Sequence, residues 1–247
     1  MIRRIPLLLS LLALASSGCD VIDASLNAER IRGSGHVIQE NRNVSGFDSV
    51  KLAAVGEMNL RQGDRESLTV EAEDNILPRI QTEVEGNALV IRVERGVSIS
   101  PTTTVRYLLT VKELANLELS GSGKIFAAPI KSREFSVRLP GSGEIRLDDL
   151  AADSLTASIS GSGSIRVPGK VSSQKVRISG SGDYDGENLQ CRTADISVSG
   201  SGDSKVWVQD ELSASISGSG HIDYYGNPRV SQHVSGSGRI RNAGDRP

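Results

Sequence analysis

Apolar and polar residues alternate along most of this chain, and the tripeptide Gly-Ser-Gly interrupts the alternation at regular intervals. In a typical repeat, Ala157 and Ile159 precede the tripeptide by four and two positions, and Ile165 and Val167 follow its first Gly by four and six. Alternation with a period of two residues is typical of a β-strand that buries one face. Each repeat therefore predicts two short strands that meet at a glycine corner, where the backbone needs a positive φ or a close approach.

The spacing of these corners predicts a β-solenoid. From the second copy onward the tripeptides begin 18 to 20 residues apart, at Gly121, Gly141, Gly161, Gly180, Gly200, Gly218 and Gly236. A repeat of about 20 residues without a helical period suits one coil of a parallel β-helix, and the Leu/Asn spacing of leucine-rich repeats does not occur here. Because only 3% of the residues are aromatic, we expect a core of small aliphatic side chains stacked about 4.8 Å apart.

The repeat pattern begins upstream of these regular copies. Residues 31–37 contain an earlier Gly-Ser-Gly, which begins at Gly33 and has apolar flanks. We therefore expect one solenoid domain over residues 31–242, with its first coil at residues 31–37 and a polar tail over residues 243–247.

The stretch that follows this first copy is less regular. Residues 50–60 carry a degenerate copy with Ala54 in place of the first Gly. Its apolar positions match a regular repeat, with Val50 and Leu52 on Leu117 and Leu119, and Met58 and Leu60 on Ile125 and Ala127. Residues 60–116 keep the alternation but lack the tripeptide, and they could hold three irregular coils or a small antiparallel sheet. The sheet would cover one end of the solenoid, which would otherwise be an unpaired edge. The pattern leaves both arrangements open.

The glycine corners are predicted to be architectural. A phosphate-binding glycine loop occurs once, between a strand and a helix, whereas this tripeptide recurs from coil to coil. The central serines are expected to stack in a ladder that satisfies backbone groups at the corner. These serines are Ser122, Ser142, Ser162, Ser181, Ser201, Ser219 and Ser237. A comb of ligand-binding serines is the alternative hypothesis.

The first residues predict export and a lipid anchor. Two arginines precede an apolar run, residues 5–15, that is too short to cross a bilayer as a helix. Cys19 follows a stretch of small residues that resembles the lipobox of bacterial lipoproteins, although Ser16 stands where that pattern usually has Leu. We therefore expect residues 1–18 to be a signal peptide, Cys19 to be lipidated and residues 19–30 to be a tether. A plain secretory signal is the alternative.

Charge and composition narrow the choice of partners. The net charge is −2 and no basic patch occurs, which argues against nucleic acid. The expected partners are the membrane, through the lipid on Cys19, and a glycan or an envelope protein, while homo-oligomers are left open. The expected location is the cell envelope, at the periplasmic face or the cell surface. Asp20 resembles the inner-membrane retention mark of enterobacterial lipoproteins, but the sequence does not decide between inner and outer membrane.

Candidates for catalysis or metal binding are few. The histidines fall on different coils, which disfavours a shared metal site. They are His36, His221 and His233. Asp183 and Asp203 hold matching positions on neighbouring coils, where they could bind a cation or act as acid and base, but two solvated carboxylates are favoured. Cys191 has no disulfide partner once Cys19 is acylated and is expected to be an inert thiol. We therefore predict no catalytic residue, no cofactor and no metal site.

Several short motifs follow one another in a specific order between Gly33 and Ile240. They are Gly-Ser-Gly-His-Val, Val-Ser-Gly-Phe-Asp-Ser-Val, Leu-Thr-Val-Glu-Ala-Glu-Asp-Asn, Gly-Asn-Ala-Leu-Val-Ile and Leu-Glu-Leu-Ser-Gly-Ser-Gly. This order resembles the DUF2807 family, also called the putative auto-transporter adhesin, head GIN domain. The resemblance implies a fold similar to right-handed β-helices, export from a bacterial cell and the adhesion role that the family name describes. It brings no catalytic residues.

The sequence thus predicts an exported lipoprotein with an all-β, right-handed parallel β-helix whose coils span about 18–21 residues. The favoured function is a non-catalytic binding or adhesion module of the cell envelope. A structural protein that assembles into an envelope scaffold is the first alternative. A β-helical carbohydrate-active enzyme is less favoured, because the regular repeats reach only about 35 Å and show no cluster of carboxylates. The fold alone does not name a ligand.

Overall fold

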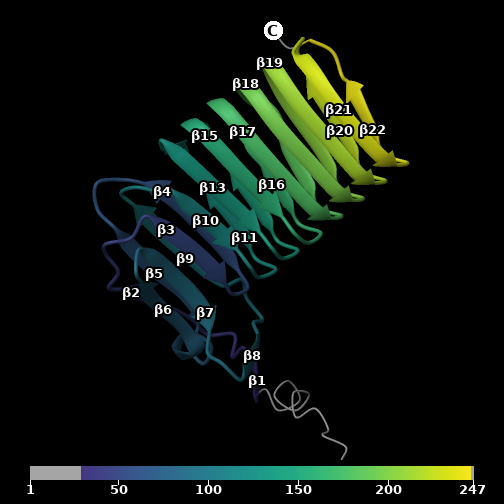
Figure 1. Ribbon diagram of the computed structural model, residues 1–247. Coiled ribbons are helices and arrows are strands. Elements are labelled where there is room, and N and C mark those ends of the chain that lie inside the picture. Colours follow the sequence, from purple (N-terminus) through teal and green to yellow (C-terminus); the bar gives the residue numbers. More distant parts are fainter. Residues whose placement is uncertain (1–28, 246–247) are drawn as a thin grey trace, which may run out of the picture.

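The computed structural model describes residues 29–245, which form an elongated stack of β-strands with β1 (Glu29–Arg32) near one end and the last described residues at the other (Figure 1). The stacked parallel coils form a β-solenoid of about six turns, which confirms the predicted fold class. The predicted signal peptide, Cys19 and the tether up to residue 28 lie outside the described residues. Within residues 29–245, no helix is long and apolar enough to cross a membrane.

Each regular coil has three sides. After the first regular corner comes β11 (Lys124–Ala127), then β12 (Ile130–Lys131) forms a short side, and β13 (Glu134–Leu139) leads to the next corner. We call the strands after a corner the post-corner face and the strands before it the pre-corner face. Neighbouring coils pair in parallel and in register, so that Ile125 lies beside Ile145.

The other coils repeat this plan. Their strands lengthen as far as β18 and β19 and are short again in the last coil. The remaining solenoid strands are β10 (Asn116–Leu119), β14 (Glu144–Leu147), β15 (Leu150–Ile159), β16 (Ser164–Arg166), β17 (Gly169–Gly180), β18 (Asp183–Gly200), β19 (Asp203–Gly218), β20 (His221–Tyr225), β21 (Arg229–Gly236) and β22 (Arg239–Asn242). β18 and β19 run through all three sides of a coil without a break, and their ladder stays parallel with two register shifts, between Gly186 and Gln190 and between Cys191 and Thr193.

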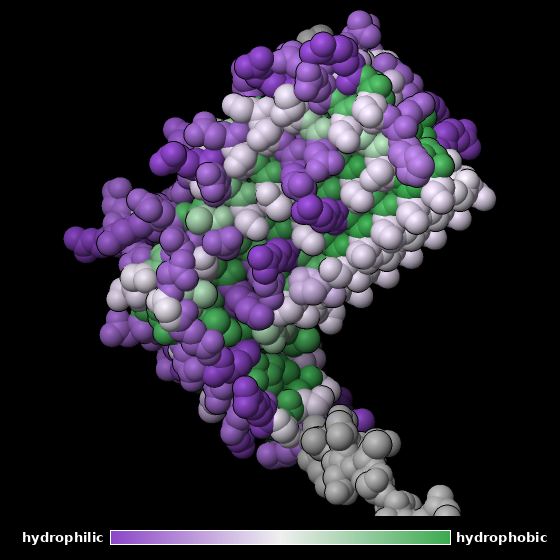
Figure 2. Space-filling view, viewed as in Figure 1, coloured by the Kyte–Doolittle hydropathy of each residue, from purple (hydrophilic) through white to green (hydrophobic). Residues whose placement is uncertain are grey.

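The corners bring the backbones of neighbouring coils into contact, and they form a pale strip along one edge of the rod in Figure 2. A Cβ atom at Gly161 would lie 2.2 Å from the carbonyl oxygen of Gly141, and one at Gly163 would lie 2.4 Å from that of Gly143. No side chain fits at that distance, so the corners require glycine for close approach. This agrees with the architectural role expected of them.

The corner serines do not behave as expected. They are exposed, and within residues 29–245 their hydroxyls make no hydrogen bond. The predicted ladder that satisfies backbone groups is therefore wrong. The backbone groups pair directly between coils instead, as in the bond from the Ser181 amide to the Gly161 carbonyl at 3.2 Å, and the hydroxyls are left to the solvent.

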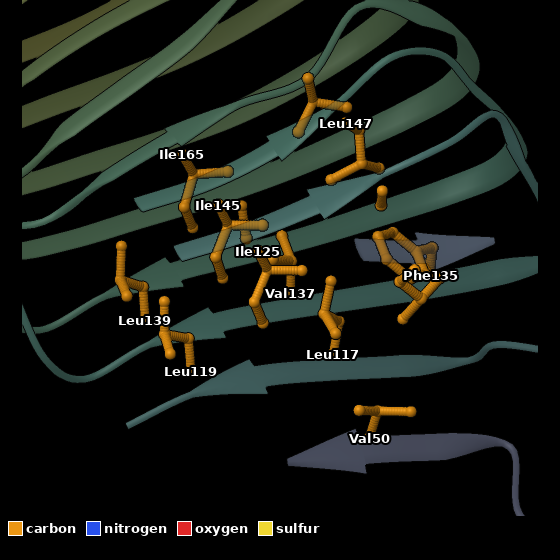
Figure 3. Close-up of a cluster of buried hydrophobic side chains, with 14 of the residues drawn as sticks. Val50, Leu117, Leu119, Ile125, Phe135, Val137, Leu139, Ile145, Leu147 and Ile165 are labelled. Carbon is orange, nitrogen blue, oxygen red and sulfur yellow. The ribbon is translucent and has the colours of Figure 1, made fainter. Parts of the chain in front are cut away.

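The inward residues form continuous apolar columns. Ile125, Ile145 and Ile165 make up one of them and are fully buried (Figure 3). Arg166, the outward neighbour of Ile165, is exposed, so the predicted alternation is confirmed. Because each isoleucine rests on the one in the coil below, the interior is filled at high density without aromatic bulk.

The part of the rod before the regular coils, which we call the head, begins with the degenerate coil at residues 50–60, packed directly on the first regular coil. Val50 lies beside Leu117 and Met58 beside Ile125, as the sequence alignment predicted. The head strands are β2 (Val37–Arg42), β3 (Ser49–Ala53), β4 (Glu57–Gln62), β5 (Ser67–Glu73), β6 (Ile80–Glu85), β7 (Ala88–Val93) and β9 (Arg106–Val111). On the side away from the solenoid, β3 and β4 pair in parallel with β7 and β9, which adds one further parallel layer.

Beyond that layer the head strands are antiparallel. β5 pairs with β9, β2 pairs with β5, and β6 pairs with β7, all in antiparallel ladders. The 3-10 helix η1 (Leu77–Arg79) lies on the segment that connects β5 to β6. Residues 60–116 therefore combine the two arrangements that the sequence left open, a parallel layer and an antiparallel cover.

Residues 31–37 do not form the expected first coil. β1 (Glu29–Arg32) pairs with β8 (Val97–Ser100) in a separate two-stranded sheet, and β2 runs antiparallel to β5. A Cβ atom at Gly33 would collide with the carboxylate of Glu73, whereas the regular corners pack on the corner of the coil below. The first Gly-Ser-Gly is therefore a loop around a carboxylate. The local pattern is that of a corner, but the strands on either side of it have other partners.

Candidate functional site

Outward residues of the post-corner face form rows along the rod, because every coil places one residue in each row. One row contains, in spatial order, Leu108, Asn59, Phe126, Arg146, Arg166, Asp185, Lys205, Asp223 and Arg241. From Arg146 onward this row is charged, with ion pairs between coils such as Arg241 with Asp223 at 2.8 Å. At the head end of the row, two apolar residues flank Asn59: Leu108, which is 43% exposed, and Phe126, which is half-buried.

A groove of about 520 Å³ lies at this apolar end, where the head joins the solenoid. Leu108 and Phe126 stand on either side of Asn59 in the row. The polar groups that line the groove are those of Asn59, Arg61, Ser67, Thr69, Thr110 and Asp148. Arg61 Nε donates a hydrogen bond to Thr110 Oγ1 at 3.1 Å, which holds the guanidinium against β9. Apolar surface with a few convergent polar groups is typical of small-molecule sites.

The sequence predicted no ligand-binding role for any residue in this groove. The sequence contains one hint of the groove, namely the positions of its two apolar residues. Leu108 is an apolar residue at an outward position of an alternating strand. Phe126 is also at an outward position, and later coils have charged residues at the equivalent position. Neither signal is specific alone, since single exposed apolar residues are common. The two side chains become one site only because β4 brings β9 and β11 to its two edges.

A larger groove, of about 1060 Å³, runs along loops near the short side of the first coils. Charged residues of both signs line it, among them Asp64, Lys112, Glu113 and Arg133. The Gln62 side chain accepts a hydrogen bond from the Lys131 amide at 2.8 Å and donates one to its carbonyl at 3.0 Å, so it occupies part of the strand edge there. The positive and negative charges that line this larger groove nearly balance, so it does not select a ligand of one charge. We therefore favour the groove beside Phe126 as the binding site.

Residues 46–228 match the family described as "Putative auto-transporter adhesin, head GIN domain", DUF2807. The chain belongs to this family. The match covers most of the solenoid and the head from β3 onward, and it confirms the resemblance seen in the ordered motifs. Among curated proteins, none matches this sequence.

Several solved structures share the architecture of this DUF2807 chain. A putative adhesin from Bacteroides fragilis is 21% identical and superimposes with a TM-score of 0.82, over 87% of this chain and 100% of that one. A putative lipid binding protein from Parabacteroides distasonis is 27% identical, with a TM-score of 0.75 over 89% of this chain and 100% of that one. A putative adhesin from Parabacteroides merdae is 21% identical, with a TM-score of 0.71 over 89% and 100%.

The histidines of this DUF2807 chain are not all on different coils, although the sequence predicted that they would be. His36 lies in the loop before β2, with its Nδ1 atom 3.6 Å from Asp74 Oδ2. His221 and His233 lie on β20 and β21, which belong to one coil between two corners. Asp183 and Asp203 are neighbours in the ladder, but Asp203 accepts a hydrogen bond from the backbone amide of His221 at 3.0 Å and also contacts its ring. In the described part of the chain, no three His, Cys, Asp or Glu side chains come close enough to hold a metal ion.

Cys191 lies in a buried polar cluster inside the solenoid. Gln174 Nε2 lies 3.1 Å from its sulfur, and the thiol lies 3.3 Å from the carbonyl oxygen of Trp207. Tyr184 completes the cluster with a hydrogen bond to the Gln174 carbonyl oxygen at 2.9 Å. Burial raises the pKa of the Cys191 thiol to about 11, so the thiolate that reacts with electrophiles hardly forms near neutral pH. This agrees with the inert thiol expected from the sequence.

Glu73 is a buried carboxylate in the head that sequence reasoning missed. The amides of Gly35 and Thr102 donate to it at 2.8 Å and 3.0 Å, and the Thr102 hydroxyl donates a further, short hydrogen bond. The bond from the Thr102 hydroxyl, together with those from the amides, outweighs the opposing effect of burial and lowers the pKa of Glu73. The charged carboxylate thereby ties the Gly33 loop to the loop that follows β8.

Proposed function

We propose that this chain is a lipid-anchored, non-catalytic binding module of the bacterial cell envelope, and that it recognises a glycan in the groove between Leu108 and Phe126. The observation that carries the proposal is this groove, where the exposed Leu108 and the half-buried Phe126 stand beside polar groups, in a row that is charged from Arg146 onward. A sugar presents apolar C–H faces together with hydroxyl groups, so a surface of mixed character suits it.

The polar groups of the groove support binding without catalysis. Asp148 is the one carboxylate among the described residues that line it, whereas glycoside hydrolysis usually requires two carboxylates on opposite sides of the scissile bond. The family is described as an adhesin, and two of the structures of similar fold carry the same description. These descriptions support an adhesion-type role at the envelope.

The anchor in this proposal is a lipid on Cys19. Figure 1 places β1, the first described strand after the tether, at the head end of the rod and the C-terminus at the other end. A lipid attached ten residues before Glu29 would keep the head near a membrane and direct the solenoid away from it. The groove beside Phe126 would then face the space next to the membrane.

Glycan-array binding tests the groove. The mature chain with Cys19→Ser, which stays soluble, is compared with the same chain carrying Phe126→Ala or Leu108→Ser. We expect each substitution to weaken glycan binding by about tenfold or more, since both remove apolar contact at the centre of the site. Arg146→Ala, at the next position of the row but outside the groove, is the matched control and should change affinity by less than about twofold.

Two results would contradict the glycan proposal. One is a glycan that binds the Phe126→Ala variant as well as the parent chain. The other is the lack of any glycan ligand while acyl chains bind, a ligand class that the description of the Parabacteroides distasonis structure brings into the test. In that case the same two variants would lose binding of a fatty-acid probe.

A further inference from the structure

The two ends of the rod are built differently. At the head end, the connection from β5 to β6 packs into the core, since its residues Ile76 and Leu77 are 0% and 2% exposed. At the other end, no segment of residues 29–245 covers the last coil. The inward residues Val230 and Val234 of β21 are 38% and 40% exposed there. We call residues 229–245 the open end.

The open end has exposed strand edges with which a strand of another chain could pair. In Figure 1, β21 and β22 terminate the stack, and among the described residues each has a strand partner on only one side. Exposed edges with alternating apolar residues pair readily with another chain, and proteins often block them with inward-pointing charges. The post-corner edge of the head, β2, has such a block, since Glu40 and Arg42 lie opposite buried core residues and contact each other at 3.2 Å. The inward positions of β21 and β22 carry no charge.

The open end is self-complementary about its own corner. Val234 and Ile240 both lie three residues from Ser237, and both are apolar inward residues. At a distance of five residues lie Gln232 and Asn242, two carboxamides, whereas the coil below has Ala214 and Tyr224 at the equivalent places. At a distance of eight lie Arg229 and Asp245, which have opposite charges.

We propose that the open end is a self-association surface, on which two copies dock end to end about a twofold axis through the Ser237 corner. The axis places β21 of one copy antiparallel to β22 of the other, and the same pairing occurs twice. Inward residues stay inward, so Val234 covers Ile240 of the second copy and Gln232 faces its Asn242. Both exposed edges are thereby paired, and the apolar columns continue across the interface.

Charge supports a second copy as the occupant. Arg229 lies opposite Asp245 of the second copy, and its side chain is 86% exposed while bound to Glu211 at 2.6 Å, so it can accept a further acidic neighbour. Arg241 would face His233 of the second copy, but its charge is balanced by Asp223 through two bonds of 3.0 Å and 2.8 Å. The proposal does not depend on the groove beside Phe126, which lies at the other end of the row.

Sedimentation equilibrium of the Cys19→Ser mature chain tests the docking. Short strand edges bury a small area, so we expect a monomer–dimer equilibrium with a dissociation constant in the micromolar range, measured at up to about 200 µM protein. Val234→Lys and Ile240→Lys should each weaken dimerisation by about tenfold or more, because they place a charge in the apolar interface. Circular dichroism melting checks that each variant is folded.

Val84→Lys is the matched control. Val84 is 37% exposed on β6, the pre-corner edge at the head end, and its substitution should leave the dimer unchanged. A parent chain that stays monomeric at the highest concentration would overturn the proposal. So would loss of association in the Val84→Lys variant, or species that keep growing with concentration, because both would mean head-to-tail stacking.

Cysteine pairing tests the register. Opposite residues of an antiparallel pair have Cβ atoms about 5 Å apart, close enough for a disulfide after a small shift. A mixture of Val234→Cys chains with Ile240→Cys chains should form a mixed disulfide dimer on oxidation, while neither variant should cross-link alone. Cys191 is buried and stays out of the reaction. A cross-link between two Val234→Cys chains would contradict the twofold axis proposed.

Discussion

At the scale of single residues, glycines stabilise this solenoid by allowing other groups to approach the backbone closely. The Gly-Ser-Gly tripeptide has two structural roles, because different groups lie next to it in the coils and in the head. At Gly161 and Gly163 the missing side chain admits the carbonyls of the coil below, and at Gly33 it admits a carboxylate. Glu73 is that carboxylate, and its hydrogen bonds join two loops of the head that are far apart in sequence.

Stability below neutral pH should depend on Glu73. Its pKa lies below the ordinary value of 4.5 in the folded chain, so its contribution is complete above that value and is lost as the pH falls through the lower, folded-state value. Glu73→Gln should lower the thermal midpoint at pH 7 and flatten its decline toward pH 3, because Gln does not titrate. Thermal melts across this pH range measure both effects.

Glu71→Gln is the control for this experiment. Glu71 lies on the outward side of the same strand and pairs with Arg106 at 2.8 Å. Its substitution should keep the steep acid dependence of the parent chain. A Glu73→Gln variant with the parent's midpoint at neutral pH would show that the carboxylate does not hold the head loops together.

At the scale of elements, the unit is the coil with its corner. Strands before and after each corner pair in parallel with the next coil, and the inward residues line up because every coil has nearly the same length. The corner itself has a buried part and an exposed part. Its second Gly packs on the coil below, and its Ser faces the solvent.

The two parts of the corner should respond differently to substitution. Gly163→Val places atoms 2.4 Å from the Gly143 carbonyl oxygen and 2.7 Å from Leu139, so we expect a loss of more than about 2 kcal/mol of unfolding free energy. Ser162→Ala removes an exposed hydroxyl without a hydrogen bond and should cost less than about 0.5 kcal/mol. Urea unfolding measures both.

The exposed corner serines also allow the comb hypothesis to be tested directly. The triple variant Ser142→Ala, Ser162→Ala, Ser181→Ala should fold like the parent chain and keep its glycan binding, because the proposed groove lies elsewhere. Loss of binding in this folded variant would assign the ligand to the corners and not to the groove beside Phe126.

At the scale of the whole molecule, the described residues form a rod with β1 at the head end and the open end opposite (Figure 1). The proposed groove and the open end therefore lie at separate places along the rod. Cys19→Ser should move the chain from the detergent-extracted membrane fraction to the soluble periplasmic or secreted fraction, because a lipid supplies most of the membrane affinity. Fractionation and immunoblotting measure the shift, and a variant that stays in the membrane would contradict the lipid anchor.

The sequence by itself determined the repeating part of this protein. Strand alternation and corner spacing are local, and each coil stacks on a near copy of itself, so the pattern of one coil predicts the packing of the next. This is why the columns of Ile125, Ile145 and Ile165, and even the register of the degenerate coil at residues 50–60, could be predicted. The family could be inferred for the same reason, from motifs in a fixed order.

Only the tertiary structure decided what depends on strands far apart in the chain. The loop at Gly33 has the local sequence of a corner, but the antiparallel pairing of β2 with β5 sets it around Glu73. Leu108 and Phe126 became one groove because β4, distant from both in sequence, lies between their strands. The open end could be identified only from the structure, because it depends on which of the described coils has no further coil packed on it. These strand pairings join segments that are not a fixed number of residues apart. The alternation of apolar and polar residues along the chain therefore cannot predict which strands pair.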